Sequence, residues 1–478
     1  MNLKKYALLM LGMSISSFAL PIDWSGSLGF DTTLIKDVRG ISDGDCGYAD
    51  AGTAGDGSQC VKKDSQNARF QTMILKLNPT LIINDSTSIK GELSTGTTRG
   101  IFLGEEQGSN QSGAYFSGNE GSSSLNINQL YAELYADTAI YRVGKFAKNF
   151  GLGAVINAGY NSWDRFYSSY SGLEANFRLG NLSLVPTFAK IGTGSATAGN
   201  GADPSGKYDV TETSVEVSYN NAINGLEGGV FYAKRDAESI NNIYTNGEGQ
   251  SVTLIDVYLK KTWEKLSIGL EAPMISGEVG TAYDATQAQD IDAKAYIFES
   301  KYTPSKQWTI GFNAGLVSGD EGNDTNFEGM YLNSNYQLAN IMFRYDLNGF
   351  QDTGKNPLNS SIRNTTYFNF YTDYKTINWK WTLSFLMAKA DQTAQSGSGF
   401  FNHERRIYST DVAAEDQSDD LGYEVDLGFE YEWNPQIIIS GFVGYYAVGD
   451  YYSFDNDPAS ELETTNIVSS GLRLSVNF

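Results

Sequence analysis

The sequence has little of the chemistry on which most enzymes depend. Among 478 residues there is one histidine, His403, and no Gly-x-Ser-x-Gly, His-Glu-x-x-His or phosphate-binding motif occurs. His403 lies beside Glu404 in a predicted long loop, where a histidine is more often a surface residue than a general base. We therefore expect a protein that is not an enzyme and that needs no cofactor.

Long apolar runs and excess positive charge are also missing. After the first residues no stretch of about eighteen apolar residues occurs, which excludes a membrane-spanning helix. The chain has 34 basic and 56 acidic side chains, for a net charge of −22. A nucleic-acid partner needs a basic surface, so none is expected.

The N-terminus has the order of a secretory signal. Lys4 and Lys5 precede a short apolar run, and small residues follow up to Ala19. This order predicts a signal peptide over residues 1–19, and the remaining residues 20–478 are predicted to form one domain.

The chain has only two cysteines, and they lie close together in the sequence. Cys46 and Cys60 flank a loop rich in glycine and aspartate. An exported chain meets an oxidising space, so we expect a disulfide between them. A metal-binding pair is the weaker alternative, because the single histidine lies far away in the sequence.

Aromatic residues and glycine are abundant, whereas proline is scarce. The chain has 30 Tyr, 25 Phe and 51 Gly but only 9 Pro. Alternating apolar and polar residues recur in about eighteen segments, as in residues 471–478, where Leu472, Leu474, Val476 and Phe478 share one face. Alternation with period two is typical of β-strands that are apolar on one side. The sequence therefore predicts an all-β fold.

The connections between these segments are alternately short and long. This rhythm is typical of an antiparallel transmembrane β-barrel, with short periplasmic turns and long extracellular loops. Lipid cannot satisfy unpaired backbone groups, so the last strand is expected to pair with the first. Six of the seven tryptophans lie beside predicted short turns, as expected of an aromatic girdle at a membrane boundary; they are Trp24, Trp263, Trp308, Trp379, Trp381 and Trp433. A soluble β-sandwich is the weaker alternative.

Three stretches carry a resemblance to a known family. Residues 127–153, 315–331 and 421–452 are similar to segments of the alginate-export-type and related porin-like outer-membrane barrels. The resemblance covers about a third of the chain, in pieces. It implies a barrel of about eighteen strands in the outer membrane of a Gram-negative bacterium, with a channel role, and it leaves the substrate open.

The predicted lumen is acidic, and two loops are long enough to narrow it. Acids outnumber bases among the residues predicted to face inward, unlike the arginine-rich lumen that the resemblance implies for polyanion exporters. Loops 150–170 and 319–362 are the longest candidates to fold inward. The residues predicted to line the pore or its constriction are Arg142, Lys145, Asp164, Arg178, Asp320, Glu321, Asp324, Glu424, Asp426, Glu430 and Arg473.

These observations predict a porin, a passive water-filled channel for small hydrophilic solutes or ions that tolerates cations. A selective saccharide or polysaccharide channel, and a plugged barrel with an adhesive or structural role, are the alternatives. The expected partners are outer-membrane lipid and lipopolysaccharide, and the barrel-assembly machinery through Phe478; the sequence leaves open whether the protein is a monomer or a homotrimer. No dedicated metal site is predicted, although the oxygen-rich acidic loops leave Ca²⁺ binding open.

Overall fold

The computed structural model describes most of the chain. The described residues are 22–42, 67–96, 101–102, 125–192, 209–237, 249–280, 288–320, 326–345, 358, 360–402, 407–454 and 462–478. Within them the only helix is a single 3₁₀ turn, η2 (Asp450–Tyr452), and none is long and apolar enough to cross a membrane. The predicted signal peptide, the predicted disulfide and His403 lie outside these ranges.

The described chain forms a closed, antiparallel barrel of eighteen strands, which confirms the predicted fold class. The barrel strands are β1 (Ile22–Lys36), β3 (Ala68–Asn84), β4 (Thr87–Thr95), β6 (Leu125–Tyr135), β7 (Ala139–Lys148), β8 (Ser168–Leu179), β9 (Leu182–Gly192), β10 (Val210–Asn221), β11 (Leu226–Ala237), β12 (Gln250–Thr262), β13 (Leu266–Gly280), β14 (Gln289–Tyr302), β15 (Trp308–Val317), β17 (Thr365–Lys375), β18 (Trp379–Lys389), β21 (Asp420–Asn434), β22 (Ile437–Val448) and β24 (Ile467–Asn477).

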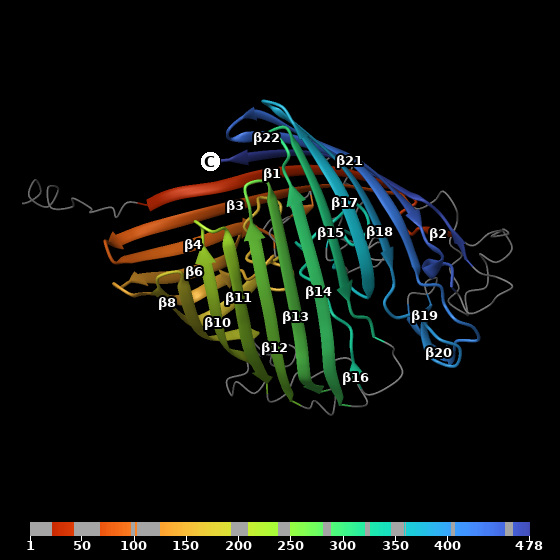
Figure 1. Cartoon of the computed structure of the whole chain (residues 1–478), viewed down its shortest axis with the longest axis horizontal. Coiled ribbons are helices and arrows are strands. Elements are labelled where there is room, and N and C mark those ends of the chain that lie inside the picture. Colours follow the sequence, from red (N-terminus) through yellow and green to blue (C-terminus); the bar gives the residue numbers. More distant parts are fainter. Residues whose placement is uncertain are drawn as a thin grey trace, which may run out of the picture.

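Six short strands accompany the barrel. Two of them extend its sheet, and the other four form two separate pairs, β2 with β23 and β19 with β20. They are β2 (Ile41–Ser42), β5 (Ile101–Phe102), β16 (Asn326–Phe327), β19 (Gly399–Asn402), β20 (Ile407–Val412) and β23 (Glu463–Thr464). Figure 1 shows β2, β16, β19 and β20 at the end of the barrel opposite to the C-terminus.

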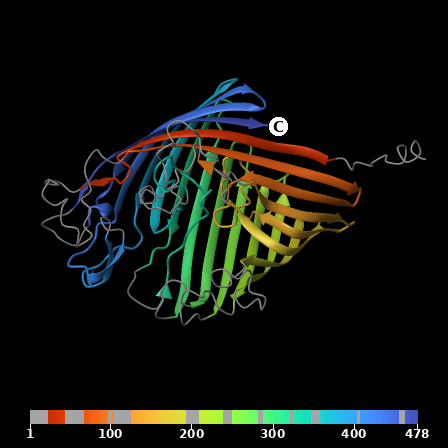
Figure 2. The ribbon, with the colours of Figure 1, turned by 180° about the vertical axis from the view of Figure 1, so that it is seen from behind.

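The first and last barrel strands close the sheet. β1 pairs with β24 from Ser27 opposite Asn477 to Lys36 opposite Val468, and its other edge pairs with β3. The amide of Gly26 donates to the Phe478 carbonyl at 2.8 Å, and the Phe478 amide donates back at 3.0 Å. In Figures 1 and 2 the C-terminal strand lies beside the red β1. The barrel therefore has no free edge here, as predicted from the last strand.

The outer wall is apolar, and tryptophans ring one end of it. Along β18, Trp379, Trp381, Leu383 and Phe385 are exposed, while the residues between them face inward. All six tryptophans beside the short turns are exposed on the outside. Exposed aliphatic and aromatic side chains on a closed barrel are what lipid covers, so the protein belongs in a bacterial outer membrane.

The inner wall is less polar than the alternation predicts. Phe231, Ile297, Tyr367 and Leu386 point inward and are almost completely buried. They are buried because chain segments fold into the lumen and pack against them. A purely polar lumen is therefore wrong for this barrel, and the inserted segments define its candidate site.

Candidate functional site

The connection between β7 and β8 crosses the lumen. Near its start Phe150 and Ile156 pack against Phe231 of β11, with the two phenylalanine rings 5.8 Å apart. Near its end Arg165 donates to the Thr72 hydroxyl of β3 at 2.6 Å. We call residues 149–167 the first inserted loop, because they reach from β11 across to β3.

The first inserted loop is also tied to the closing seam of the barrel. Lys76 of β3 donates its ammonium group to the carbonyls of Gly159, at 3.3 Å, and Asn161, at 2.5 Å. The Ser162 hydroxyl donates to the Asn477 side chain at 3.0 Å. Gly29 of β1 is required here, because a Cβ atom at this position would lie 2.9 Å from the Trp163 ring.

The chain after β15 enters the lumen as well. We call residues 326–345 the second inserted loop. Met330, Leu332 and Ile341 are buried in the largest apolar cluster among the described residues. The Tyr336 hydroxyl donates to Glu299 of β14 at 2.7 Å, and burial raises the pKa of Tyr336 well above its ordinary value. The second inserted loop is therefore a packed part of the core.

The two inserted loops contact each other through backbone and amide groups. The backbone N–H of Asn333 donates to the Ala154 carbonyl at 2.6 Å. The Asn335 side chain accepts from the Phe166 amide at 3.2 Å and donates to its carbonyl at 2.6 Å. Together the loops divide the lumen, and the remaining space lies around them.

Buried carboxylates on the wall hold both loops in place. Glu424 of β21 accepts backbone hydrogen bonds from Asn340, Ile341 and Met342, at 2.6 to 2.9 Å, and Asp426 accepts one from Asn340 at 3.1 Å. Glu271 of β13 accepts the backbone amide of Leu152 in the first loop. A buried carboxyl group that accepts backbone amides satisfies donors that would otherwise lack partners, so it anchors the segment that donates them.

A narrow space of about 70 Å³ lies where the loops approach the seam. We call it the passage; it has room for only a few water molecules. Three arginines line it, namely Arg165, Arg344 and Arg473, together with the acids Asp31 and Asp164. Basic side chains thus outnumber acidic ones around the passage.

Each charged group of the passage has a distinct environment. Arg473 pairs with Asp31 at 2.6 Å, and its guanidinium lies 5.0 Å from the centre of the Trp163 ring. Burial lowers the pKa of the Arg165 guanidinium, to about 10, so it is still charged at neutral pH. Arg344 lies over the Phe442 ring at 5.6 Å.

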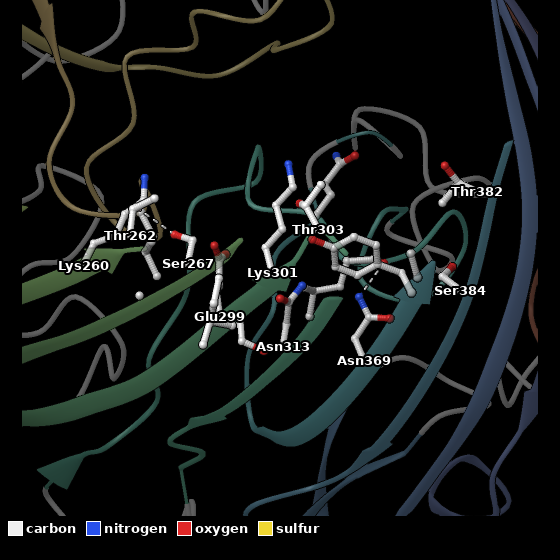
Figure 3. A pocket seen from close by; sticks show the side chains of 18 of the residues that line it. Lys260, Thr262, Ser267, Glu299, Lys301, Thr303, Asn313, Asn369, Thr382 and Ser384 are labelled. Carbon is white, nitrogen blue, oxygen red and sulfur yellow. Dashed lines mark hydrogen bonds between the residues drawn. The ribbon is translucent and has the colours of Figure 1, made fainter. Parts of the chain in front are cut away.

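A larger cavity of about 830 Å³ opens beside the passage, on the side of the short turns. Five side chains from β12, β14, β15 and β17 point into it, as Figure 3 shows: Lys260, Glu299, Lys301, Asn313 and Asn369. We call this larger cavity the vestibule. Gln337 and Arg344 line both the vestibule and the passage, so the two spaces meet at these side chains.

Many inward charges are paired along the wall. Arg142 bridges Glu133, at 3.0 Å, and Glu174, at 3.2 Å, while Lys148 contacts Glu174 at 3.1 Å. Lys90 pairs with Glu133, and Arg235 pairs with Glu212 at 2.8 Å. These bases therefore compensate the charges of Glu133, Glu174 and Glu212 on the inner wall.

The structure separates the residues predicted to line the pore. Asp164 and Arg473 lie at the passage, whereas Glu424 and Asp426 anchor the second inserted loop. Arg178 lies at the rim next to a short turn, and Glu430 pairs there with Lys380 at 2.9 Å. Asp320 accepts the Glu328 amide at 3.0 Å. Glu321 and Asp324 lie outside the described residues.

Lys145 differs from the prediction. It lies opposite Leu130 in the sheet, and Leu130 is exposed on the outer face. Residues directly opposite each other share one face, so Lys145 points out of the barrel, where its ammonium donates to the Ile127 carbonyl at 3.3 Å. It therefore belongs to the outer wall and not to the lumen.

Sequence reasoning missed Asp31, Arg165 and Arg344. Asp31 lies on the inward face of β1, which alternation alone could have shown. Arg165 follows Trp163 in an aromatic stretch, and Arg344 follows the apolar Ile341 and Met342. Apolar residues inside a long loop are the one signal that such a loop is buried.

No family model and no curated protein sequence matches the chain. Among solved structures it is similar to Pseudomonas aeruginosa OccK2 (OpdF) in complex with glucuronate, with a TM-score of 0.52, 11% identity, and coverage of 95% of this chain and 98% of that one. It is similar to OccK8 (OprE) of the same organism, with a TM-score of 0.50, 11% identity, and coverage of 95% and 98%.

These similarities concern the fold. They support a porin-like outer-membrane barrel, and they do not support the expected alginate-export-type family.

Proposed function

We propose that the protein is a passive channel of the outer membrane that admits small hydrophilic solutes and prefers anions. The observation that carries this proposal is the passage, where Arg165, Arg344 and Arg473 outnumber Asp31 and Asp164. Charges in a narrow space between low-dielectric walls act strongly on a passing solute.

The passage keeps a net positive charge, because Asp31 compensates Arg473 and leaves Arg165 and Arg344 against the single carboxylate of Asp164. Asp31 binds Arg473, and Asp164 accepts the backbone and side-chain amides of Asn161 at 3.0 and 3.1 Å. A solute carboxylate would find guanidinium donors able to form charge-assisted hydrogen bonds. OccK2, which shares the fold, was solved in complex with glucuronate, a sugar acid of this class.

This preference replaces the cation tolerance expected from the count of inward acids. Glu133, Glu174 and Glu212 are paired with wall bases, so their charges are compensated away from the passage. The vestibule, with Lys260, Lys301 and Glu299, carries mixed charge.

Single-channel recording in a planar bilayer tests the proposal. In a KCl gradient we expect a steady open current whose reversal potential shows chloride passing more readily than potassium. Glucuronate added to one side should reduce the current more than uncharged glucose does. A cation-selective reversal potential would contradict the anion preference, and no current at all would favour a plugged barrel.

A further inference from the structure

The second inserted loop bends immediately after its anchored amides. Asn340, Ile341 and Met342 donate three consecutive backbone N–H groups to Glu424. The residue that follows, Phe343, has φ 62°, which is unusual for a bulky side chain.

This bend determines where Arg344 lies. The Arg344 amide donates to the Ile341 carbonyl at 3.2 Å, and its guanidinium donates to the Asn340 side chain at 3.2 Å. Both partners belong to the tripeptide that Glu424 holds. Arg344 is also one of the two side chains that line both the passage and the vestibule.

The wall is shaped to receive this anchor. Glu424 is 1% exposed and Asp426 is 3% exposed. A Cβ atom on Gly444 of β22 would lie 2.4 Å from Asp426 and 3.2 Å from Ile341, so glycine leaves room for both. A left-handed Phe343 costs free energy and persists only where its surroundings enforce it.

We propose that Glu424 is a positioning residue for ion selectivity: by holding the backbone of residues 340–342, it fixes Arg344 at the junction of the passage and the vestibule. This inference rests on the proposed channel function. Glu424 itself contacts no passing solute, because its carboxylate is covered by the amides that it binds.

The test compares isosteric variants by reversal potential in a KCl gradient. Glu424→Gln keeps the volume of the side chain, but its NH₂ group cannot accept the Met342 amide. We expect the chloride-to-potassium permeability ratio to fall about threefold, with noisier open current. Glu430→Gln, on the same strand at the exposed rim, is the matched control and should leave the ratio unchanged.

A double variant separates positioning from general loosening. Arg344→Gln should lower the ratio directly, and Glu424→Gln combined with Arg344→Gln should lower it no further. Additive effects, or a Glu424→Gln channel with the original ratio, would overturn the inference. An original channel without anion preference would instead overturn the proposed function.

Folding of each variant is checked by its migration on unheated electrophoresis gels. If Glu424→Gln does not fold, Glu424→Asp replaces it, because it keeps the carboxyl group and withdraws the oxygens by one methylene. We expect an intermediate permeability ratio for Glu424→Asp, and a ratio equal to that of the original channel would overturn the inference.

Discussion

At the scale of single residues, the charge of the passage depends on the pair between Asp31 and Arg473. The carboxylate of Asp31 also accepts the Thr33 hydroxyl at 2.7 Å, so it is held on two sides. Both partners are largely buried. A buried guanidinium without its carboxylate is costly, because its charge is no longer compensated.

We therefore expect Asp31→Asn to change selectivity and stability in opposite directions. The chloride-to-potassium permeability ratio should rise, since one negative charge leaves the passage. The free energy of unfolding should fall by about 3 kcal/mol, measured by denaturant titration in detergent. Glu430→Gln, whose pair with Lys380 is half-exposed, should cost less than about 1 kcal/mol. Unchanged selectivity in Asp31→Asn would show that solutes avoid the passage.

Glu424 and Asp426 show what the sequence predicts about a single residue and what it does not. Alternation places Glu424 and Asp426 on the inward face, and the structure agrees. Their role is different, because the amides that they bind lie more than 80 residues away in the sequence. A short-range pattern shows which way a side chain points, but not what folds against it.

At the scale of elements, the first inserted loop is seated by aromatic packing. The Phe150 ring lies 5.8 Å from Phe231 and 6.3 Å from Tyr258, and Ile156 completes the cluster. Phe150→Ala would leave a cavity that the rigid barrel wall cannot fill, at a cost of about 3 kcal/mol.

Because of this loss of packing, the first inserted loop should detach from the wall while the barrel itself stays folded. We expect Phe150→Ala to raise single-channel conductance and to expose residues 158–165 to protease, with cleavage located by mass spectrometry. Phe385→Ala, on the outer face of β18, removes the same ring without touching the loop and is the control. Equal protection of residues 158–165 in both variants would contradict this role of Phe150.

At the scale of the whole molecule, the barrel was predictable because each strand repeats a local pattern and closure follows from the lack of water in lipid. The division of the lumen was only partly predictable. Loop length indicated which segments could enter, whereas their contacts with β3, β13 and β21 depend on the closed barrel.

Closure itself depends on one close approach at the seam. A Cβ atom on Gly26 would lie 2.4 Å from the Lys76 carbonyl oxygen and 2.8 Å from the Phe478 ring, so β1 can pair with both neighbours there only because the residue is glycine. Gly428 on β21 is the matched control, since its nearest atom is an ordinary 3.6 Å away.

We expect Gly26→Ala to destabilise the closed barrel by about 2 kcal/mol, because the added methyl group must push β24 or β3 outward. Fewer molecules should then migrate as folded barrel on unheated gels after refolding at rising urea concentration. Gly428→Ala should refold like the original chain. If both variants refold equally well, the seam tolerates the added methyl group, and the pairing of β1 with β24 is not what limits closure.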